Sequence, residues 1–182
     1  MSAGSNLPPL TLVLGGAASG KSRYAEALVE RAAVRPIYIA TAEARDPEMA
    51  ERIRLHRARR GARWRTLEMP LELVPALAAH AGPDAGVLVD CLTLWLSNLL
   101  DAGRDADAAA AALLAALPAL GGPVVFVANE VGLGIVPENA LARRFRDAAG
   151  RLNAGLAAAA DAVAFMAAGL PLHLKTPPPS GA

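Results

Sequence analysis

LTLVLGGAASGKS, residues 10–22, is the most informative segment of this 182-residue chain. Its first five residues form an apolar run that predicts a buried strand, and two glycines follow at once. Residues 15–22 then match the pattern G-x-x-x-x-G-K-[ST] in full. Glycines allow a tight turn whose backbone N–H groups point at phosphate oxygens, and the N-terminus of a following helix adds a favourable dipole. The segment therefore predicts a phosphate cradle for a nucleoside triphosphate, in which Lys21 reaches the β- and γ-phosphates and Ser22 binds Mg²⁺.

A strand is expected directly before the motif and a helix directly after it, which argues against a chance glycine-rich turn. Short apolar runs also alternate with helical patterns along the rest of the chain. We expect strands at 10–14, 36–40, 87–89, 124–127, 162–166 and 172–174, and helices at 21–33, 46–60, 71–80, 93–100, 106–117 and 138–160. Strands that are apolar throughout are covered on both faces, and their alternation with helices implies parallel pairing. The expected fold is α/β: a single P-loop NTPase domain at 10–175, with a mostly parallel sheet flanked by helices, between a flexible N-terminus at 1–9 and a flexible C-terminal tail at 176–182.

The composition sets limits on partners and location. The net charge is +1, so no overall field favours nucleic acid or an anionic membrane. The single cysteine, Cys91, excludes an internal disulfide, and together with a start that lacks signal-peptide features it favours the cytoplasm. The apolar stretch 156–172 is mostly alanine and is interrupted by Asp161, so we expect the end of a helix and a buried strand there, not a membrane span.

Asp90 closes the apolar run at 87–89. A carboxylate at the end of such a strand can hold Mg²⁺ directly or through water, as the Walker-B aspartate does. The alternative is a helix N-cap for the segment that starts near Thr93. The presence of the phosphate cradle favours the metal role.

His56 lies among seven arginines on the helix expected at 46–60 and just after it: Arg52, Arg54, Arg57, Arg59, Arg60, Arg63 and Arg65. Such a cluster should attract an anion, and nearby positive charge favours the neutral, nucleophilic imidazole. We therefore consider that His56 attacks a nucleotide phosphorus while the arginines hold the polyphosphate. The alternatives are a solvated basic face with an incidental histidine, or half-buried packing that continues the stripe of Met49 and Ile53. A nucleic-acid role is weaker still, because Trp64 is the one aromatic side chain interleaved with the arginines.

Five other features are less specific. The segment 129–132, Asn-Glu-Val-Gly, follows an expected strand and either lines the ligand crevice or forms an ordinary turn. Cys91 and Trp95 are expected in the core, and His80 and His173 are expected to be structural.

Several motifs recur together over residues 10–175. They are GGxxSGKSRYAE from Gly15, YIATA from Tyr38, DxEMxxRIxxHR from Asp46, WxTxE from Trp64, DCLTxWxxNLL from Asp90, NEVGxGIVPE from Asn129 and FRDxxGxxN from Phe145. This set resembles the bifunctional adenosylcobinamide kinase and adenosylcobinamide-phosphate guanylyltransferase family of cobalamin biosynthesis. The motif that holds His56 and the one that begins at Asn129 are the specific ones, since the P-loop alone is generic.

The resemblance implies two reactions and a set of site residues. ATP or GTP phosphorylates adenosylcobinamide, and GTP then gives GMP to a histidine, from which it passes to adenosylcobinamide phosphate to form adenosylcobinamide-GDP. The implied catalytic residues are His56 and Lys21, the implied Mg²⁺ ligands are Ser22 and Asp90, and the implied assembly is a homotrimer. The implied nucleotide contacts are Gly15, Gly16, Ala17, Ala18, Ser19, Gly20, Lys21, Ser22, Ala40, Thr41, Ala42, Arg57, Ala58, Arg59, Arg60, Glu68 and Asp90.

The sequence departs from the family pattern at three positions. Ala18 stands where many relatives have arginine, Ala62 where proline is common, and Ala154 where glutamine is usual. None of these removes a matched chemical group. Two other functions remain open from the residues: a P-loop small-molecule kinase without a covalent histidine intermediate, and a regulatory nucleotide-binding module. The regulatory module is disfavoured because residues 129–132 do not match the Asn-Lys-x-Asp motif that reads guanine in such domains.

Overall fold

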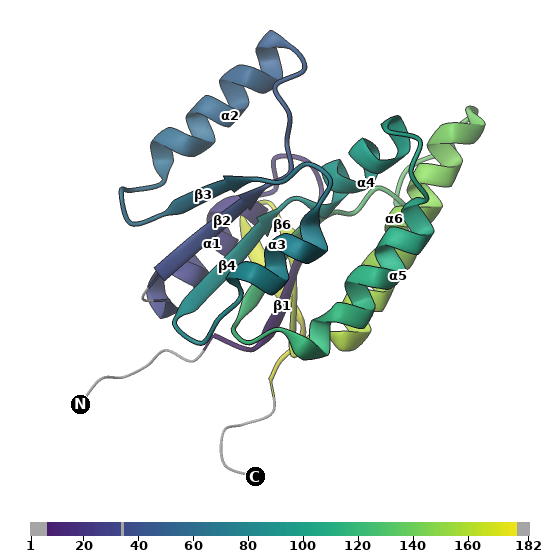
Figure 1. Cartoon of the computed structure of the whole chain (residues 1–182). Coiled ribbons are helices and arrows are strands. Elements are labelled where there is room, and N and C mark those ends of the chain that lie inside the picture. Colours follow the sequence, from purple (N-terminus) through teal and green to yellow (C-terminus); the bar gives the residue numbers. More distant parts are fainter. Residues whose placement is uncertain (1–6, 34, 178–182) are drawn as a thin grey trace.

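A seven-stranded sheet with helices on both faces forms the body of the protein (Figure 1). The computed structural model describes residues 7–33 and 35–177. Its strands are β1 (Leu10–Gly15), β2 (Arg35–Ala40), β3 (Arg65–Glu68), β4 (Ala85–Asp90), β5 (Val124–Asn129), β6 (Ala162–Ala167) and β7 (Leu170–Lys175). The order across the sheet is β3-β2-β4-β5-β1-β6-β7. The pairings from β3 to β6 are parallel and β7 is antiparallel to β6, which confirms the expected mostly parallel sheet.

The helices are α1 (Lys21–Ala32), α2 (Pro47–Arg59), α3 (Leu73–His80), α4 (Leu92–Asp101), α5 (Ala106–Ala116) and α6 (Ala140–Ala159), and a 3-10 turn covers Leu117–Ala119. Each predicted helix is present, with ends that differ by a few residues. The strand β3 was not predicted. The expected flexible termini lie outside the described residues, apart from 7–9 and 176–177, which belong to neither a helix nor a strand.

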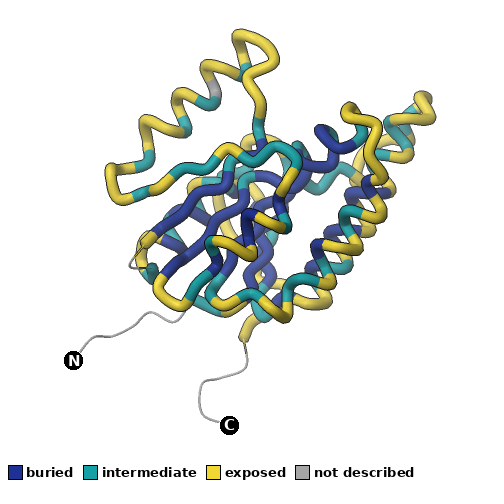
Figure 2. Tube along the Cα trace, viewed as in Figure 1, coloured by how far each residue is buried: buried dark blue, intermediate teal, exposed yellow. Residues whose placement is uncertain are grey.

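The two faces of the sheet are covered by different helices. Side chains alternate along each strand, so Leu12 and Val89 pack against α3 to α6, while Val13 and Leu88 pack against α1. All four of these side chains are fully buried (Figure 2), and Trp95 is buried in the larger cluster as expected. Burial on both faces explains why the strands are continuous apolar runs and fixes the carboxyl edge of the sheet as a rigid platform.

The apolar stretch 156–172 contains the end of α6 and the strand β6, as expected. The helix ends at Ala159 and β6 begins at Ala162. Asp161, the residue that interrupts the stretch, binds Leu10 twice: its carboxylate accepts a 2.9 Å hydrogen bond from the Leu10 amide, and its own amide donates to the Leu10 carbonyl at 2.9 Å. Within residues 7–33 and 35–177, no helix is both long and apolar enough to cross a bilayer.

The helix α2 stands away from the body, above the carboxyl edge of β2 and β3 (Figure 1). Its start was correctly predicted: Asp46 is the N-cap and accepts a 2.7 Å hydrogen bond from the Met49 amide, and Pro47 occupies the first turn. Most of its described side chains are exposed and none is buried (Figure 2).

Candidate nucleotide-binding site

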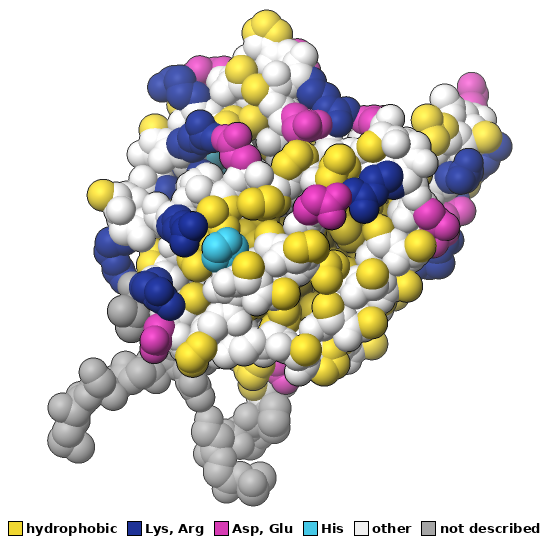
Figure 3. Space-filling model, viewed as in Figure 1, with side chains coloured by type: hydrophobic (Ala, Val, Ile, Leu, Met, Phe, Trp, Pro, Cys, Tyr) yellow, Lys and Arg dark blue, Asp and Glu magenta, His cyan; other side chains and the backbone are white. Residues whose placement is uncertain are grey.

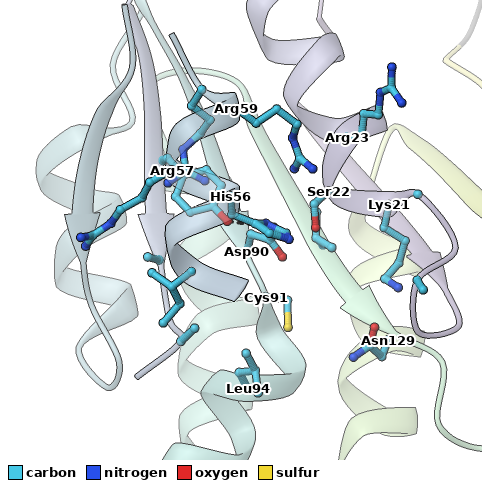
Figure 4. A pocket seen from close by; sticks show the side chains of 18 of the residues that line it. Lys21, Ser22, Arg23, His56, Arg57, Arg59, Asp90, Cys91, Leu94 and Asn129 are labelled. Atoms are coloured by element: carbon cyan, nitrogen blue, oxygen red, sulfur yellow. Dashed lines mark hydrogen bonds between the residues drawn. The ribbon is translucent and has the colours of Figure 1, made fainter. Parts of the chain in front are cut away.

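A cavity of about 350 Å³ lies between α2 and the carboxyl ends of four adjacent strands, β2, β4, β5 and β1. In open α/β sheets this edge is where ligands bind. Figure 4 shows the P-loop side chains on one wall and those of α2 on the other. The cavity is lined by Ala18, Ser19, Gly20, Lys21, Ser22, Arg23, Tyr38, Ala40, Ala42, Met49, Ile53, His56, Arg57, Arg59, Arg60, Asp90, Cys91, Leu94, Val127 and Asn129.

The loop between β1 and α1 has the geometry of a phosphate cradle. A side chain at Gly15 would place its Cβ 2.5 Å from the Met166 carbonyl oxygen, and Gly20 adopts a φ of 93° as the N-cap of α1, so both positions need glycine. Lys21 is 7 % exposed, and its ammonium group donates to the Gly16 carbonyl and lies 3.4 Å from the Ser19 hydroxyl. A buried cation is thus held against the glycine-rich loop at the start of α1, an arrangement suited to a polyanion.

Asp90 ends β4 and lines the cavity with Ser22. The N-cap alternative is wrong, because α4 has Cys91 at that position and no side chain caps the helix. The Asp90 carboxylate instead accepts a 2.9 Å hydrogen bond from the Tyr38 hydroxyl. Burial and the neighbouring carboxylate raise the pKa of Tyr38, so the phenol keeps its proton and continues to donate.

The donor set suits Mg²⁺ rather than a metal held by the protein alone. The described part of the chain contains no group of three or more His, Cys, Asp or Glu side chains arranged to hold a metal ion. Mg²⁺ is commonly bound by one or two protein oxygens, with phosphates and water completing its coordination. The Ser22 hydroxyl and the Asp90 carboxylate, both on the cavity wall, are the predicted pair.

His56 faces the same cavity as the cradle (Figure 4). It lies on α2 in one stripe with Met49 and Ile53, and all three side chains are half-buried on the cavity wall. The face of α2 that was considered for packing, with Met49, Ile53 and His56, is therefore the face that lines the cavity. Nucleophilic attack on a bound nucleotide requires this juxtaposition of the imidazole with Lys21 and Ser22, although the role itself remains a prediction.

The arginines around His56 have carboxylate partners that the sequence did not suggest. Arg57 forms an ion pair with Glu68 of β3, and Arg59 forms two hydrogen bonds of 2.8 and 3.0 Å with Glu26 of α1. Arg54 faces away from the cavity and pairs with Glu51 one turn earlier. These carboxylates offset part of the charge that was expected to attract an anion. Acidic and basic side chains are likewise interspersed over the face of the molecule seen in Figure 3.

Six of the predicted nucleotide contacts lie off the cavity wall: Gly15, Gly16, Ala17, Thr41, Ala58 and Glu68. Thr41 is fully buried and joins the ends of β2 and β4. Its hydroxyl donates to the Cys91 carbonyl at 2.7 Å and accepts from the Cys91 amide at 2.9 Å, while its carbonyl accepts from Asn98 at 2.7 Å. The structure therefore gives Thr41 a supporting position behind the wall.

Two residues at or beside the site, Tyr38 and Glu26, were not predicted as part of it: Tyr38 binds Asp90, and Glu26 is a buried carboxylate that binds Arg59. Asn129 lines the cavity at the end of β5, which was one of the two alternatives for residues 129–132. The two unpredicted residues left weak signals in the sequence. Tyr38 interrupts an aliphatic strand, and Glu26 lies between Ala25 and the other apolar positions of the buried face of α1, where a charge needs a partner.

The comparisons with known proteins agree on one family. The profile of the cobinamide kinase / cobinamide phosphate guanyltransferase family matches residues 11–174. The chain is 50 % identical over 169 residues to the bifunctional adenosylcobalamin biosynthesis protein CobP of Pseudomonas aeruginosa, with 92 % of this chain and 98 % of that protein covered. It is 44 % identical over 181 residues to the corresponding CobU proteins of Salmonella typhimurium and Escherichia coli, with 91 % of this chain and 99 % of each relative covered.

Solved structures of low sequence identity share the fold alone. One is a protein of Pyrococcus horikoshii OT3, at 10 % identity and a TM-score of 0.55, with 97 % of this chain and 91 % of that chain covered. Another is the flagellar accessory protein FlaH of Methanocaldococcus jannaschii, at 14 % identity and a TM-score of 0.50, with 96 % and 82 % covered.

Proposed function

Because the chain belongs to the cobinamide kinase / cobinamide phosphate guanyltransferase family, we propose that it carries out both reactions of cobalamin biosynthesis at the cavity between the cradle and α2. In the first, ATP or GTP phosphorylates the hydroxyl of adenosylcobinamide. In the second, GTP supplies GMP to adenosylcobinamide phosphate. The observation that carries this proposal is the presence of His56, Lys21 and Ser22 on the walls of one cavity.

The triphosphate is bound by the P-loop and the start of α1. The backbone amides of residues 15–22 and the N-terminus of α1 provide positive potential, and Lys21 leaves the Gly16 carbonyl to bind the β- and γ-phosphates. Ser22 and Asp90 would hold Mg²⁺, which would neutralise charge on the phosphate oxygens. Arg57, Arg59 and Arg60 complete the cationic wall on the α2 side.

His56 acts as the nucleophile of the guanylyl transfer. A neutral imidazole nitrogen attacks the α-phosphorus of GTP, the bond to the β-phosphate oxygen breaks, and pyrophosphate leaves with that electron pair. A phosphate oxygen of adenosylcobinamide phosphate then attacks the same phosphorus, the P–N bond breaks and His56 is restored. The phosphoramidate keeps the transfer potential between the two steps, so one difficult displacement is divided into two easier ones.

Labelling with GTP tests the covalent step. The protein is incubated with GTP labelled at the α-phosphorus and then denatured. We expect an acid-labile, alkali-stable label on the wild type and none on His56→Ala. Lys21→Ala serves as a second variant, because loss of the phosphate-binding ammonium abolishes phosphorylation of adenosylcobinamide. Equal labelling of wild type and His56→Ala would contradict guanylylation of His56, and absence of label from the wild type would leave a P-loop small-molecule kinase without a covalent intermediate.

We also propose that the protein works in the cytoplasm as a homo-oligomer, a trimer by family resemblance. The single free cysteine supports a reducing compartment. Apolar side chains left exposed on the subunit support the assembly, since subunit contacts commonly cover such groups. They lie between β5 and α6, at the start of α6 and on β7: Leu133, Ile135, Val136, Leu141, Leu170, Leu172 and Leu174.

A further inference from the structure

The helix that carries His56 is not held by a hydrophobic face. None of its described side chains is buried, and the three half-buried residues Met49, Ile53 and His56 border the cavity rather than the core. Most helices in globular proteins owe their stability and position to an apolar stripe packed on the body. Polar contacts at the ends of α2 must therefore set the place of the imidazole.

Glu26 of α1 provides the principal contact at the C-terminal end of α2. Its side chain is 7 % exposed and faces two arginines. Arg59 binds it through Nε at 2.8 Å and Nη2 at 3.0 Å, and Nη1 of Arg60 lies 3.7 Å away. A bidentate arginine–carboxylate pair fixes distance and orientation together, and the hydrogen bonds that Arg59 donates to Glu26 raise the pKa of Arg59. A buried carboxylate with two cationic partners is a rigid anchor, because losing either side leaves an uncompensated charge.

The second arginine connects this anchor to the metal-binding side of the cavity. The Arg60 side chain is 4 % exposed, and its guanidinium carbon lies 3.5 Å from the centre of the Tyr38 ring. The Tyr38 hydroxyl donates to Asp90 at 2.9 Å. Contacts of this kind between a cation and an aromatic face are strengthened when solvent is excluded. A continuous series of contacts thus runs from Glu26 through Arg60 and Tyr38 to Asp90.

We propose that Glu26 is a positioning residue for guanylyl transfer, holding the α2 helix so that His56 faces the α-phosphorus of the nucleotide bound in the cradle. His56 precedes Arg59, the last residue of α2, by three residues, a spacing that brings side chains to one face of a helix, and Arg60 is the C-cap of the same helix. Fixing the two arginines therefore fixes the imidazole. Glu26 itself lies on the helix that begins at Lys21, so one carboxylate sets the two walls of the site relative to each other. This inference rests on the proposed function of His56.

The test is Glu26→Gln, with Glu51→Gln as its matched control. Glu51 forms the exposed pair with Arg54 on the same helix, so its substitution also removes one carboxylate–arginine contact but leaves the anchor intact. We expect Glu26→Gln to slow formation of the labelled protein from GTP by roughly 10- to 100-fold, because ångström-scale misplacement of a reacting group costs about that much. The phosphorylation rate should change less than about threefold, since the Lys21 cradle is untouched. Glu51→Gln should leave both rates unchanged.

A second readout separates positioning from folding. Amide hydrogen exchange over residues 47–60 should be faster in Glu26→Gln than in wild type or Glu51→Gln, while exchange over β1 and β5 stays the same. Glu26→Asp, which keeps the charge on a shorter side chain, should restore part of the labelling rate.

The outcomes are distinguishable. Labelling of Glu26→Gln at the wild-type rate would overturn the positioning role, as would loss of both activities in equal proportion. If the wild type itself carries no label that depends on His56, the proposed covalent function fails. In that case exchange over residues 47–60 still reports whether Glu26 fixes α2.

Discussion

At the scale of single residues, the site depends on charges placed where water is scarce. Lys21, Glu26 and Arg60 are nearly inaccessible, yet each has an opposite charge or a polar group close by. Such groups cost free energy unless they are paired, so their positions are well defined. Tyr38 is bound to Asp90 in the same manner, which gives the carboxylate a fixed orientation toward the cavity.

Cys91 supplies a pH-dependent prediction at this scale. Burial raises the pKa of its thiol to about 11 from an ordinary value of 9.0. The unfolded chain loses the proton near pH 9, whereas the folded chain keeps it until about pH 11. The contribution of Cys91 to stability is thus fully present below pH 9 and is lost as the pH rises through this window, by about 2 to 3 kcal/mol at most.

Urea unfolding of wild type and Cys91→Ala at pH 8 and pH 11 measures this effect. Alanine lacks the titrating thiol, so the free energy of unfolding of the variant should fall less between the two values of pH. Any packing lost in the variant is the same at both and cancels from the difference. An equal fall in the two proteins would contradict the assignment to Cys91.

At the scale of elements, α2 combines a well-defined start with a weakly packed body. Asp46→Ala removes the side-chain cap from the Met49 amide and should destabilise the helix by about 1 kcal/mol. Because α2 contributes little to the core, the loss should appear as local opening: amide exchange in its first two turns rises about fivefold.

A matched control for this prediction exists in α5, where Asp105 caps the helix by accepting a 3.0 Å hydrogen bond from the Ala108 amide. Asp105→Ala should accelerate exchange at the start of α5 and leave α2 unchanged. If Asp46→Ala instead lowered the stability of the whole domain and left local exchange in α2 unaltered, the helix would be more tightly coupled to the core than its exposure indicates.

Most helices and strands could be predicted from the sequence alone, and the exceptions have physical reasons. The apolar runs and the Asp46-Pro47 start predicted most strands and the position of α2. The strand β3 was missed because its four residues have exposed, charged ends and form no apolar run, and its pairing with β2 depends on where the chain returns after α2. The motif residues of the site were likewise predicted. Glu26 was not, because its partners are 33 or more residues away in sequence.

At the scale of the whole molecule, the sheet order brings together residues that are distant in the chain. The cradle after β1, Ala40 of β2, Asp90 of β4 and Asn129 of β5 meet because β2, β4, β5 and β1 are neighbours. Because these four strands are parallel, their carboxyl ends lie at one edge of the sheet, and the motif residues that follow them line one cavity.

The proposed trimer is the prediction at this scale. Light scattering of the purified protein should give the mass of three chains of 18.7 kDa each. Leu172→Lys places a charge among the exposed leucines of β7 and should lower that mass, whereas Leu55→Lys on α2, where leucine is 53 % exposed, should not. A single-chain mass for wild type at micromolar concentration would contradict the assembly.

Because the cradle and His56 share one cavity, the two proposed reactions must use it one after the other. The spent diphosphate from the phosphorylation step occupies the place that the next GTP needs, so nucleotide exchange separates the two half-cycles. We therefore expect added nucleoside diphosphate to slow the guanylyl step by competing with GTP for the cradle. The phosphorylated corrinoid can receive GMP only after that exchange has taken place.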